Sequence, residues 1–273
     1  MTFVMDRAWE EAVRLLKGNL GLLLTVAGVV VFLPTVASTL IFPQSDFESR
    51  MPQGDDPSME QMSEVMAAIL ADYWWLFAIT ILISIFANLA LMALLRRQRT
   101  PTVAEAFSEA VRAMPTAIGA VALQIAIFAA LVVVLVGLPS AASSALGAVG
   151  ALLLLPIALY LVVKFSVTSA VIIIEGERNP VAVLRRSWWL TKGNSFRLFF
   201  FYLLLLVAFI VVSAIASLVV GSVFALATPS VATFGLAIYE AALSVIVSLV
   251  AAAITVAIHA QLRRLREQGP AAD

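Results

Sequence analysis

Six long apolar runs divide the sequence, and they constrain its fold more than any other feature. Each contains 22 to 29 residues, and together they make up over half of the chain. Because a helix rises about 1.5 Å per residue, each run can cross a hydrocarbon core about 30 Å thick. None alternates polar and apolar residues as barrel strands do. The runs predict transmembrane helices at Leu20–Phe42, Trp74–Leu95, Thr116–Gly137, Leu146–Ile174, Leu198–Ala225 and Val231–His259.

The composition excludes an ordinary water-soluble domain. Hydrophobic residues make up 62% of the 273 residues, charged residues 12%, and the mean hydropathy is +1.04. Soluble domains are closer to half apolar and carry about twice this share of charge. We therefore expect an all-α membrane protein in which residues 1–273 form one polytopic domain.

Lys and Arg are distributed unevenly between the connecting segments. If the N-terminus is cytoplasmic, 15 of the 17 lie in the cytoplasmic segments, leaving Arg50 on the opposite side and Lys164 inside a span. Cytoplasmic segments of membrane proteins carry such an excess of basic residues. We therefore predict that both termini are cytoplasmic.

The connection at 43–73 is predicted to lie on the opposite, extracytoplasmic side and carries seven acidic residues. Its first half is rich in turn-forming residues, whereas Ser58–Leu70 can form a short surface helix. The acids of Gly54-Asp55-Asp56 suggest loose binding of a divalent cation. A solvated acidic loop is the alternative, because the spacing of a calcium-binding loop is absent.

The chain contains three copies of one unit. Offsets of 98 and 175 residues align segments around Trp9, Phe107 and Leu184, with matching positions at i, i+3, i+4 and i+7 on one helix face. Each segment precedes two spans and carries basic residues off its apolar face. We therefore expect three hairpins, each preceded by a cytoplasmic amphipathic helix in the membrane interface. The units are 5–95, 102–174 and 179–262, followed by a short tail at 263–273.

The third amphipathic segment is the most informative. Its predicted helix has an N-terminal cap, a proline in the first turn, a glycine at its end and a cap for the following helix, at Asn179, Pro180, Gly193 and Asn194. Trp188 and Trp189 suit the level of the lipid headgroups. We expect them to act as anchors, with anionic headgroups bound by Arg185, Arg186 and Lys192. An ordinary connecting helix is the alternative.

Polar residues inside the spans are the other candidates for function, at Lys164, Glu240, Asn88 and Gln124. Charges are costly inside a bilayer. Lys164 and Glu240 lie at depths that allow them to pair if the fourth and sixth spans are neighbours. The alternatives are a snorkelling Lys164 and a hydrated Glu240. Asn88 and Gln124 are expected to form hydrogen bonds between helices.

Other residues in the spans predict how the helices pack and bend. Small residues at every fourth position predict close helix packing, at Ser213, Ser217 and Gly221 and at Ser244, Ser248 and Ala252. Pro34 and Pro156 are expected to kink their helices.

The sequence shows no arrangement of residues for catalysis. Cysteine is absent, and the single histidine, His259, is expected to be a polar tip at the interface rather than a metal ligand. Hydrolase, phosphate-loop and dinucleotide motifs are absent. We therefore expect a protein that is not an enzyme and has no metal, cofactor or nucleic-acid partner.

The run from Ile172 to Phe199 resembles a motif of the glycerophosphoryl diester phosphodiesterase membrane domain family and of YciC-like bacterial membrane proteins. The matching residues are Glu175, Gly176, Ala182, Leu184, Arg185, Arg186, Ser187, Trp188, Leu190, Lys192 and Gly193, with a basic residue also at Lys164. The resemblance implies a membrane domain standing alone in a bacterial inner membrane. The associated hydrolysis needs a soluble barrel with histidines and a metal site, for which this chain has no residues.

Three functional hypotheses follow. The leading one is a non-enzymatic membrane protein that binds or organises lipids through basic interfacial helices. The second is a transporter with a cavity around Lys164, Glu240 and Asn88. The third is an accessory subunit or homo-oligomer whose small-residue faces dock a membrane partner.

Overall fold

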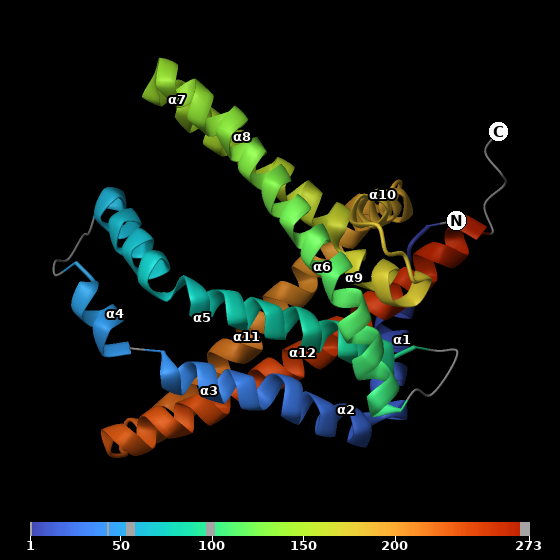
Figure 1. The fold of residues 1–273 in the computed structure, drawn as a ribbon, viewed down its shortest axis with the longest axis horizontal. Helices are drawn as coiled ribbons and strands as arrows, with labels where there is room; N and C mark the ends of the chain where they lie inside the picture. The colour runs from blue at the N-terminus through green and yellow to red at the C-terminus, as the bar shows by residue number, and fades with distance from the viewer. Residues whose placement is uncertain (1, 43, 53–57, 97–101, 268–273) are drawn as a thin grey trace.

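The computed structural model describes residues 2–42, 44–52, 58–96 and 102–267 (Figure 1). The secondary structure of these residues is helical, and among them six segments are long and apolar enough to cross a membrane. These segments are Leu20–Ile41, Glu60–Leu94, Val103–Ala142, Ser144–Glu175, Ser195–Phe224 and Ser230–Glu267. The prediction of an all-α, multi-pass membrane protein with six spanning helices is confirmed.

The six spans pair as three successive hairpins. The first consists of α2 (Leu20–Ala27), η1 (Gly28–Phe32), α3 (Leu33–Ile41), α4 (Gln44–Arg50) and α5 (Met59–Leu94). The second consists of α6 (Val103–Val132), η2 (Val133–Gly137), α7 (Leu138–Ala142), α8 (Ser144–Phe165), α9 (Thr168–Ala170) and η3 (Val171–Glu175). The third consists of α11 (Ser195–Phe224) and α12 (Pro229–Glu267), and it follows α10 (Pro180–Thr191).

The hairpins meet at one end and diverge toward their tips (Figure 1). At the shared end α1 (Met5–Gly18) packs along α12, α5 packs on α6, and α10 contacts α6, α8 and α12. At the tip of the second hairpin, by contrast, η2 and α7 pack mainly against α6 and α8 and contain no buried residue. We call the shared end, formed by 2–18, 102–116, 176–198 and 256–267, the basic end.

The close contact of α5 and α6 depends on small side chains. The buried face of α6 near the basic end is a row of alanines, at Ala106, Ala110, Ala113, Ala117 and Ala120. On α5 the facing region contains buried Ala90 and Ala93. Small residues let helix backbones approach closely, which is a main source of helix association in a membrane. This contact between α5 and α6 joins the first two hairpins.

Of the small residues predicted to pack the third hairpin, Ser217 lies at the contact of α11 and α12, whereas a side-chain carbon at Gly221 would meet no atom within 4 Å. The Ser217 hydroxyl lies 3.0 Å from the Tyr239 hydroxyl, which joins α11 to α12. Near the tip, Gly235 packs so close to the Phe224 ring that a side-chain carbon there would overlap it. Ala252 on α12 is fully buried.

Two of the three predicted amphipathic segments are separate helices. α1 and α10 each end before the span that follows them. The second is different, because α6 runs from Val103 to Val132 without a break and is capped by Thr102, whose hydroxyl accepts from the Glu105 backbone N–H. The prediction of three separate interfacial helices is therefore wrong at the second unit. Pro115 lies in α6 without ending it.

A proline follows a π-helical turn in two of the spans. The π-helices η1 and η2 end two residues before Pro34 and Pro139, respectively. Proline lacks the N–H that an α-helix donates to residue i−4, and a shift to i→i+5 bonding lets the next residue donate instead. α8, in contrast, continues through Pro156. The helix of this fourth span is interrupted later, at Val167 (φ −103°, ψ 11°).

The acidic connection folds against the start of α5. Arg50 on α4 pairs with Asp46 at 2.9 Å and with Asp72 at 2.7 Å, and the Tyr73 hydroxyl donates to Asp46 at 2.8 Å. The expected surface helix at 58–70 is the first part of α5, which departs from helical geometry at Tyr73 (φ −115°) and then continues as a helix to Leu94. Gly54, Asp55 and Asp56, the suggested cation ligands, lie outside the described residues.

The Tyr73 hydroxyl, aided by Arg50, lowers the pKa of the Asp46 carboxyl below its ordinary value of 3.8. A lowered pKa means that this contact stabilises the fold above pH 3.8 and that the contribution is lost as pH falls through the lowered value. We expect a ¹³C NMR titration of Asp46 to give a midpoint below 3.8, and Tyr73→Phe to raise it. The matched variant Tyr239→Phe should leave it unchanged. A wild-type midpoint at or above 3.8 would contradict the assignment.

Candidate functional site

The segment that carries the family resemblance forms a fixed platform at the basic end. Gly176 (φ +73°) and Gly193 (φ +83°) adopt the left-handed conformation that favours glycine, and they end η3 and follow α10, respectively. Asn179 caps α10 as predicted, since its side-chain oxygen accepts from the N–H groups of Val181 and Ala182. Pro180 packs on Gly119 of α6, where a side-chain carbon would lie 2.7 Å from its ring.

One face of α10 is buried against the fourth span. Val183, Leu190 and Thr191 are inaccessible, as is Ser187. The Ser187 hydroxyl donates to the Lys164 carbonyl oxygen at 2.7 Å. Because α8 ends one residue later, this carbonyl is among those that the helix end leaves without an intrahelical partner. Ser187 therefore docks α10 onto the break in the fourth span.

Glu175 joins three elements through its carboxylate. Its Oε2 accepts from Arg186 Nε of α10 at 2.7 Å, and its Oε1 lies 2.9 Å from His259 Nε2 of α12. The His259 side chain is 1% exposed. The expectation that His259 is an interfacial tip is therefore wrong, because its side chain is buried and contacts Glu175 of η3. Arg186 was expected to be free for headgroups, but it is held by this carboxylate.

Lys164 is buried beneath aromatic rings and does not pair with Glu240. Its residue is 2% exposed, and its ammonium lies 5.1 Å from the Trp188 ring centre and 5.2 Å from that of Tyr160. Such cation–π contacts stabilise a desolvated ammonium. Glu240 instead accepts a hydrogen bond from Thr39 at 3.4 Å. The suggested ion pair is therefore absent, because each residue has a different neighbour.

Trp189 stacks with two arginines. The guanidinium carbons of Arg186 and Arg266 lie 4.7 and 4.9 Å from its ring centre, and Arg266 also donates to the backbone carbonyls of Trp189 and Lys192. Arg266 was not a candidate in the sequence, and its position at the end of α12 gave no signal beyond its charge. It extends the cationic group of α10 onto α12.

The outer face of α10 presents cations and tryptophans together. Trp188 and Trp189 are 38% and 42% exposed. Arg185 and Lys192 are exposed, and within the described part of the chain neither forms an ion pair. Lys192 and Arg266 are also close enough to repel the ammonium of Lys164 electrostatically. We call this group the cationic platform: Arg185, Trp188, Trp189 and Lys192 on the outer face of α10 and at its end, Arg266 of α12 beside them, and Lys164 of α8 buried beneath Trp188.

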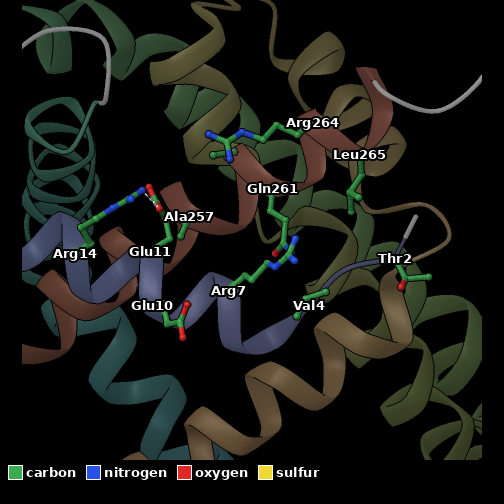
Figure 2. Close-up of a pocket in the computed structure, with 11 residues that line it drawn as sticks. Thr2, Val4, Arg7, Glu10, Glu11, Arg14, Ala257, Gln261, Arg264 and Leu265 are labelled. Atoms are coloured by element: carbon green, nitrogen blue, oxygen red, sulfur yellow. Dashed lines mark hydrogen bonds and ion pairs between the residues drawn. The ribbon is translucent and has the colours of Figure 1, made fainter.

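A second cationic hollow lies where α1 crosses α12 (Figure 2). It has a volume of about 930 Å³, and its charged lining residues are Arg7, Glu10, Glu11, Arg14 and Arg264. Glu11 pairs with Arg14. The hollow depends on contact between the two ends of the chain, which local sequence patterns cannot reveal.

The remaining polar residues of the spans are Asn88 on α5 and Gln124 on α6. Gln124 of α6 donates to the Thr168 hydroxyl of α9. This is the expected hydrogen bond between helices, and at 3.5 Å it is long. Asn88 differs, because its side-chain oxygen is buried without a donor. Asn88 lines two cavities, of about 340 and 390 Å³.

Comparison with known proteins adds no assignment, since no family model, curated protein or solved structure matches the chain.

Proposed function

We propose that this integral membrane protein binds anionic lipid headgroups at the cationic platform, on the cytoplasmic side of a bacterial inner membrane. The observation that carries the proposal is that two half-exposed tryptophans of α10 lie beside exposed Arg185 and Lys192. Among the residues that the structure describes, neither of these two cations pairs with a carboxylate. Tryptophan favours the headgroup level, and each nearby Lys or Arg contributes about 1 kcal/mol to binding of an anionic surface.

The contacts of the platform separate two roles. Arg186 and Ser187 hold α10 in place through Glu175 and Lys164. Arg185 and Lys192 are left to contact lipid phosphates. Lys164, sheltered by the Trp188 ring, supplies further positive potential beneath them. The excess of Lys and Arg in the predicted cytoplasmic segments and the family resemblance support the orientation and the membrane.

The test measures retention of phosphatidylglycerol against phosphatidylcholine on the purified protein by native mass spectrometry. We expect preferential retention of phosphatidylglycerol, reduced roughly thirtyfold in the double variant Arg185→Ala/Lys192→Ala, because two cations that each contribute about 1 kcal/mol to headgroup binding are lost.

The matched control is Lys17→Ala/Arg263→Ala, which removes two charges from other positions at the basic end. Lys17 is exposed, and Arg263 pairs with Glu267. This control should retain at least half of the wild-type preference. If both double variants lose equally, general attraction rather than the platform explains binding. If neither loses any, the proposal fails.

A further inference from the structure

The hollow between α1 and α12 is lined by one face of each helix (Figure 2). Its lining residues recur at intervals of three or four, as expected for two facing helix surfaces. On α1 and just before it they include Val4, Arg7, Glu11 and Arg14, and those of α12 fall between Ala257 and Leu265. The hollow is therefore a surface built by the crossing of two helices.

The walls of the hollow are held in place by contacts between α1 and α12. Ala8 and Ala12 are buried on α1, and such small side chains let two helices approach closely. The side-chain amide of Gln261, turned to satisfy both groups, donates to the Val4 carbonyl at 3.2 Å and accepts from the Val4 N–H at 3.1 Å. The preceding residue, Phe3, is buried. The site is therefore formed before any ligand arrives.

Two of the three arginines that line the hollow have no anionic partner in the described part of the chain. Arg14 pairs with Glu11, as the dashed line in Figure 2 shows. Arg7 and Arg264 are exposed, and among the described residues neither forms an ion pair. The other acidic lining residue, Glu10, lies below α1 in Figure 2, whereas Arg264 lies above it. The hollow thus offers an anion two guanidinium groups from opposite ends of the chain.

The neighbouring arginines of α12 are engaged elsewhere. Arg263 pairs with Glu267 at 2.7 Å, and Arg266 stacks on Trp189. At about 100° per residue, Arg266 lies on the face of α12 opposite to Arg264. The hollow and the cationic platform are therefore separate sites on opposite faces of one helix.

Trp9 indicates the direction in which the hollow opens. It is 45% exposed, and helical spacing places it on the face of α1 opposite to Arg7 and Glu11. An exposed tryptophan favours the headgroup level, so the opposite face of an interfacial helix is turned to water. A ligand of the hollow therefore comes from the aqueous phase rather than from the bilayer.

We propose that this hollow binds the phosphate group of a water-soluble small molecule, with Arg7 and Arg264 as the phosphate ligands. The planar guanidinium group can donate two parallel hydrogen bonds to a phosphate. The volume of about 930 Å³ leaves room for the rest of a small molecule. Glu10 can accept hydrogen bonds from its hydroxyl groups. No aromatic side chain is among the described lining residues, so a nucleotide base would find no ring to stack on.

The test titrates inorganic pyrophosphate into the full chain in phosphatidylcholine nanodiscs, by calorimetry at constant ionic strength. We expect saturable binding. Arg7→Gln and Arg264→Gln should each weaken it about tenfold, because each removes one charge-assisted contact to phosphate. Both side chains are exposed, so both variants should keep the wild-type Tm.

The matched control is Lys17→Gln/Arg263→Gln, which removes two charges from the same two helices at positions that do not line the hollow. It should keep at least half of the wild-type affinity, whereas Arg7→Gln/Arg264→Gln should lose measurable binding. Equal losses in the two double variants would show that net charge alone attracts pyrophosphate, and the proposal would fail. It would also fail if the wild-type protein showed no saturable binding.

Repeating the titration in nanodiscs that contain phosphatidylglycerol identifies the source of the phosphate. An unchanged affinity for pyrophosphate supports a soluble ligand. If phosphatidylglycerol displaces pyrophosphate, and Arg7→Gln/Arg264→Gln also loses retention of this lipid, the phosphate belongs to a headgroup. That result would overturn the assignment of a soluble ligand.

Discussion

Glu175→Ala is expected to destabilise the protein by about 3 kcal/mol, because this one substitution removes the carboxylate that contacts both Arg186 and His259. Arg186 loses bonds at 2.7 and 3.2 Å, and the buried His259 loses its bond at 2.9 Å. Breaking a buried ion pair costs about 3–5 kcal/mol. The lower end applies here because the Arg186 side chain is 37% exposed and can regain water. The measurement is the free energy of unfolding in mixed detergent micelles.

The matched control is Glu177→Ala, two residues along the chain. Within the described ranges its carboxylate accepts only from the backbone N–H groups of Arg178 and Asn179, so its loss should cost about 1 kcal/mol or less. A cycle with His259→Ala should give a coupling of about 1–3 kcal/mol between Glu175 and His259. Equal losses in the two glutamate variants, or additive losses in the cycle, would contradict a central role for Glu175.

This network also shows where sequence patterns stop being informative. The helices, the cap at Asn179 and the left-handed glycine at Gly193 depend on neighbouring residues, so local patterns predicted them. The partners of His259 could not be predicted in this way, because Glu175 lies 84 residues earlier and meets it only after hairpins two and three pack together.

Asn194 shows the same limit at a single residue. It was expected to cap α11, but it makes no side-chain cap bond there. Its oxygen instead accepts from the Phe3 backbone N–H at 2.9 Å. Phe3 is buried against Phe201, with ring centres 5.8 Å apart. An asparagine before a helix predicts a cap, but a distant donor can compete successfully for the same oxygen.

The second unit was misread for a physical reason. Amphipathic periodicity predicts a helix and its apolar face but not whether the helix ends. α1 ends at Gly18 and is followed by Asn19, and Gly193-Asn194 lie between α10 and α11, whereas no glycine or asparagine separates the second segment from its span. Pro115 lies there instead, and α6 continues through it. The absence of a stop signal was the available evidence for one long helix.

Several of the polar contacts between distant segments involve α12. This helix carries Glu240 against Thr39, His259 in the Glu175 network and Arg266 against Trp189. α11, in contrast, has few buried residues, and most of its large apolar side chains are exposed to the surroundings. These polar contacts lie on the helix that packs against α1, α2, α3, α5 and α10, whereas α11 packs mainly against α8 and α12.

Gly150→Ala is expected to open the tip of the second hairpin, with a cost of about 3 kcal/mol. A side-chain carbon at Gly150 would overlap the Leu135 carbonyl oxygen and approach its carbon at 2.7 Å. These are backbone atoms of the π-helix η2, so no side-chain rotation can relieve the clash, and the cost lies at the upper end of that for overpacking. Because this tip has few other contacts, the loss should be local. Amide exchange in α7 and the first half of α8 should accelerate roughly a hundredfold.

Gly137→Ala provides the matched control within the same hairpin. A side-chain carbon at Gly137 meets no atom within 4 Å. Alanine is about 1 kcal/mol more favourable than glycine in a helix, so this variant should slow exchange or leave it unchanged. The two substitutions add the same methyl group with opposite expected signs, so helix propensity cannot explain a difference between them. Unchanged amide exchange in Gly150→Ala would mean that Gly150 of α8 does not pack against the Leu135 carbonyl of η2. Another contact would then have to explain why α8 lies so close to η2 at this tip.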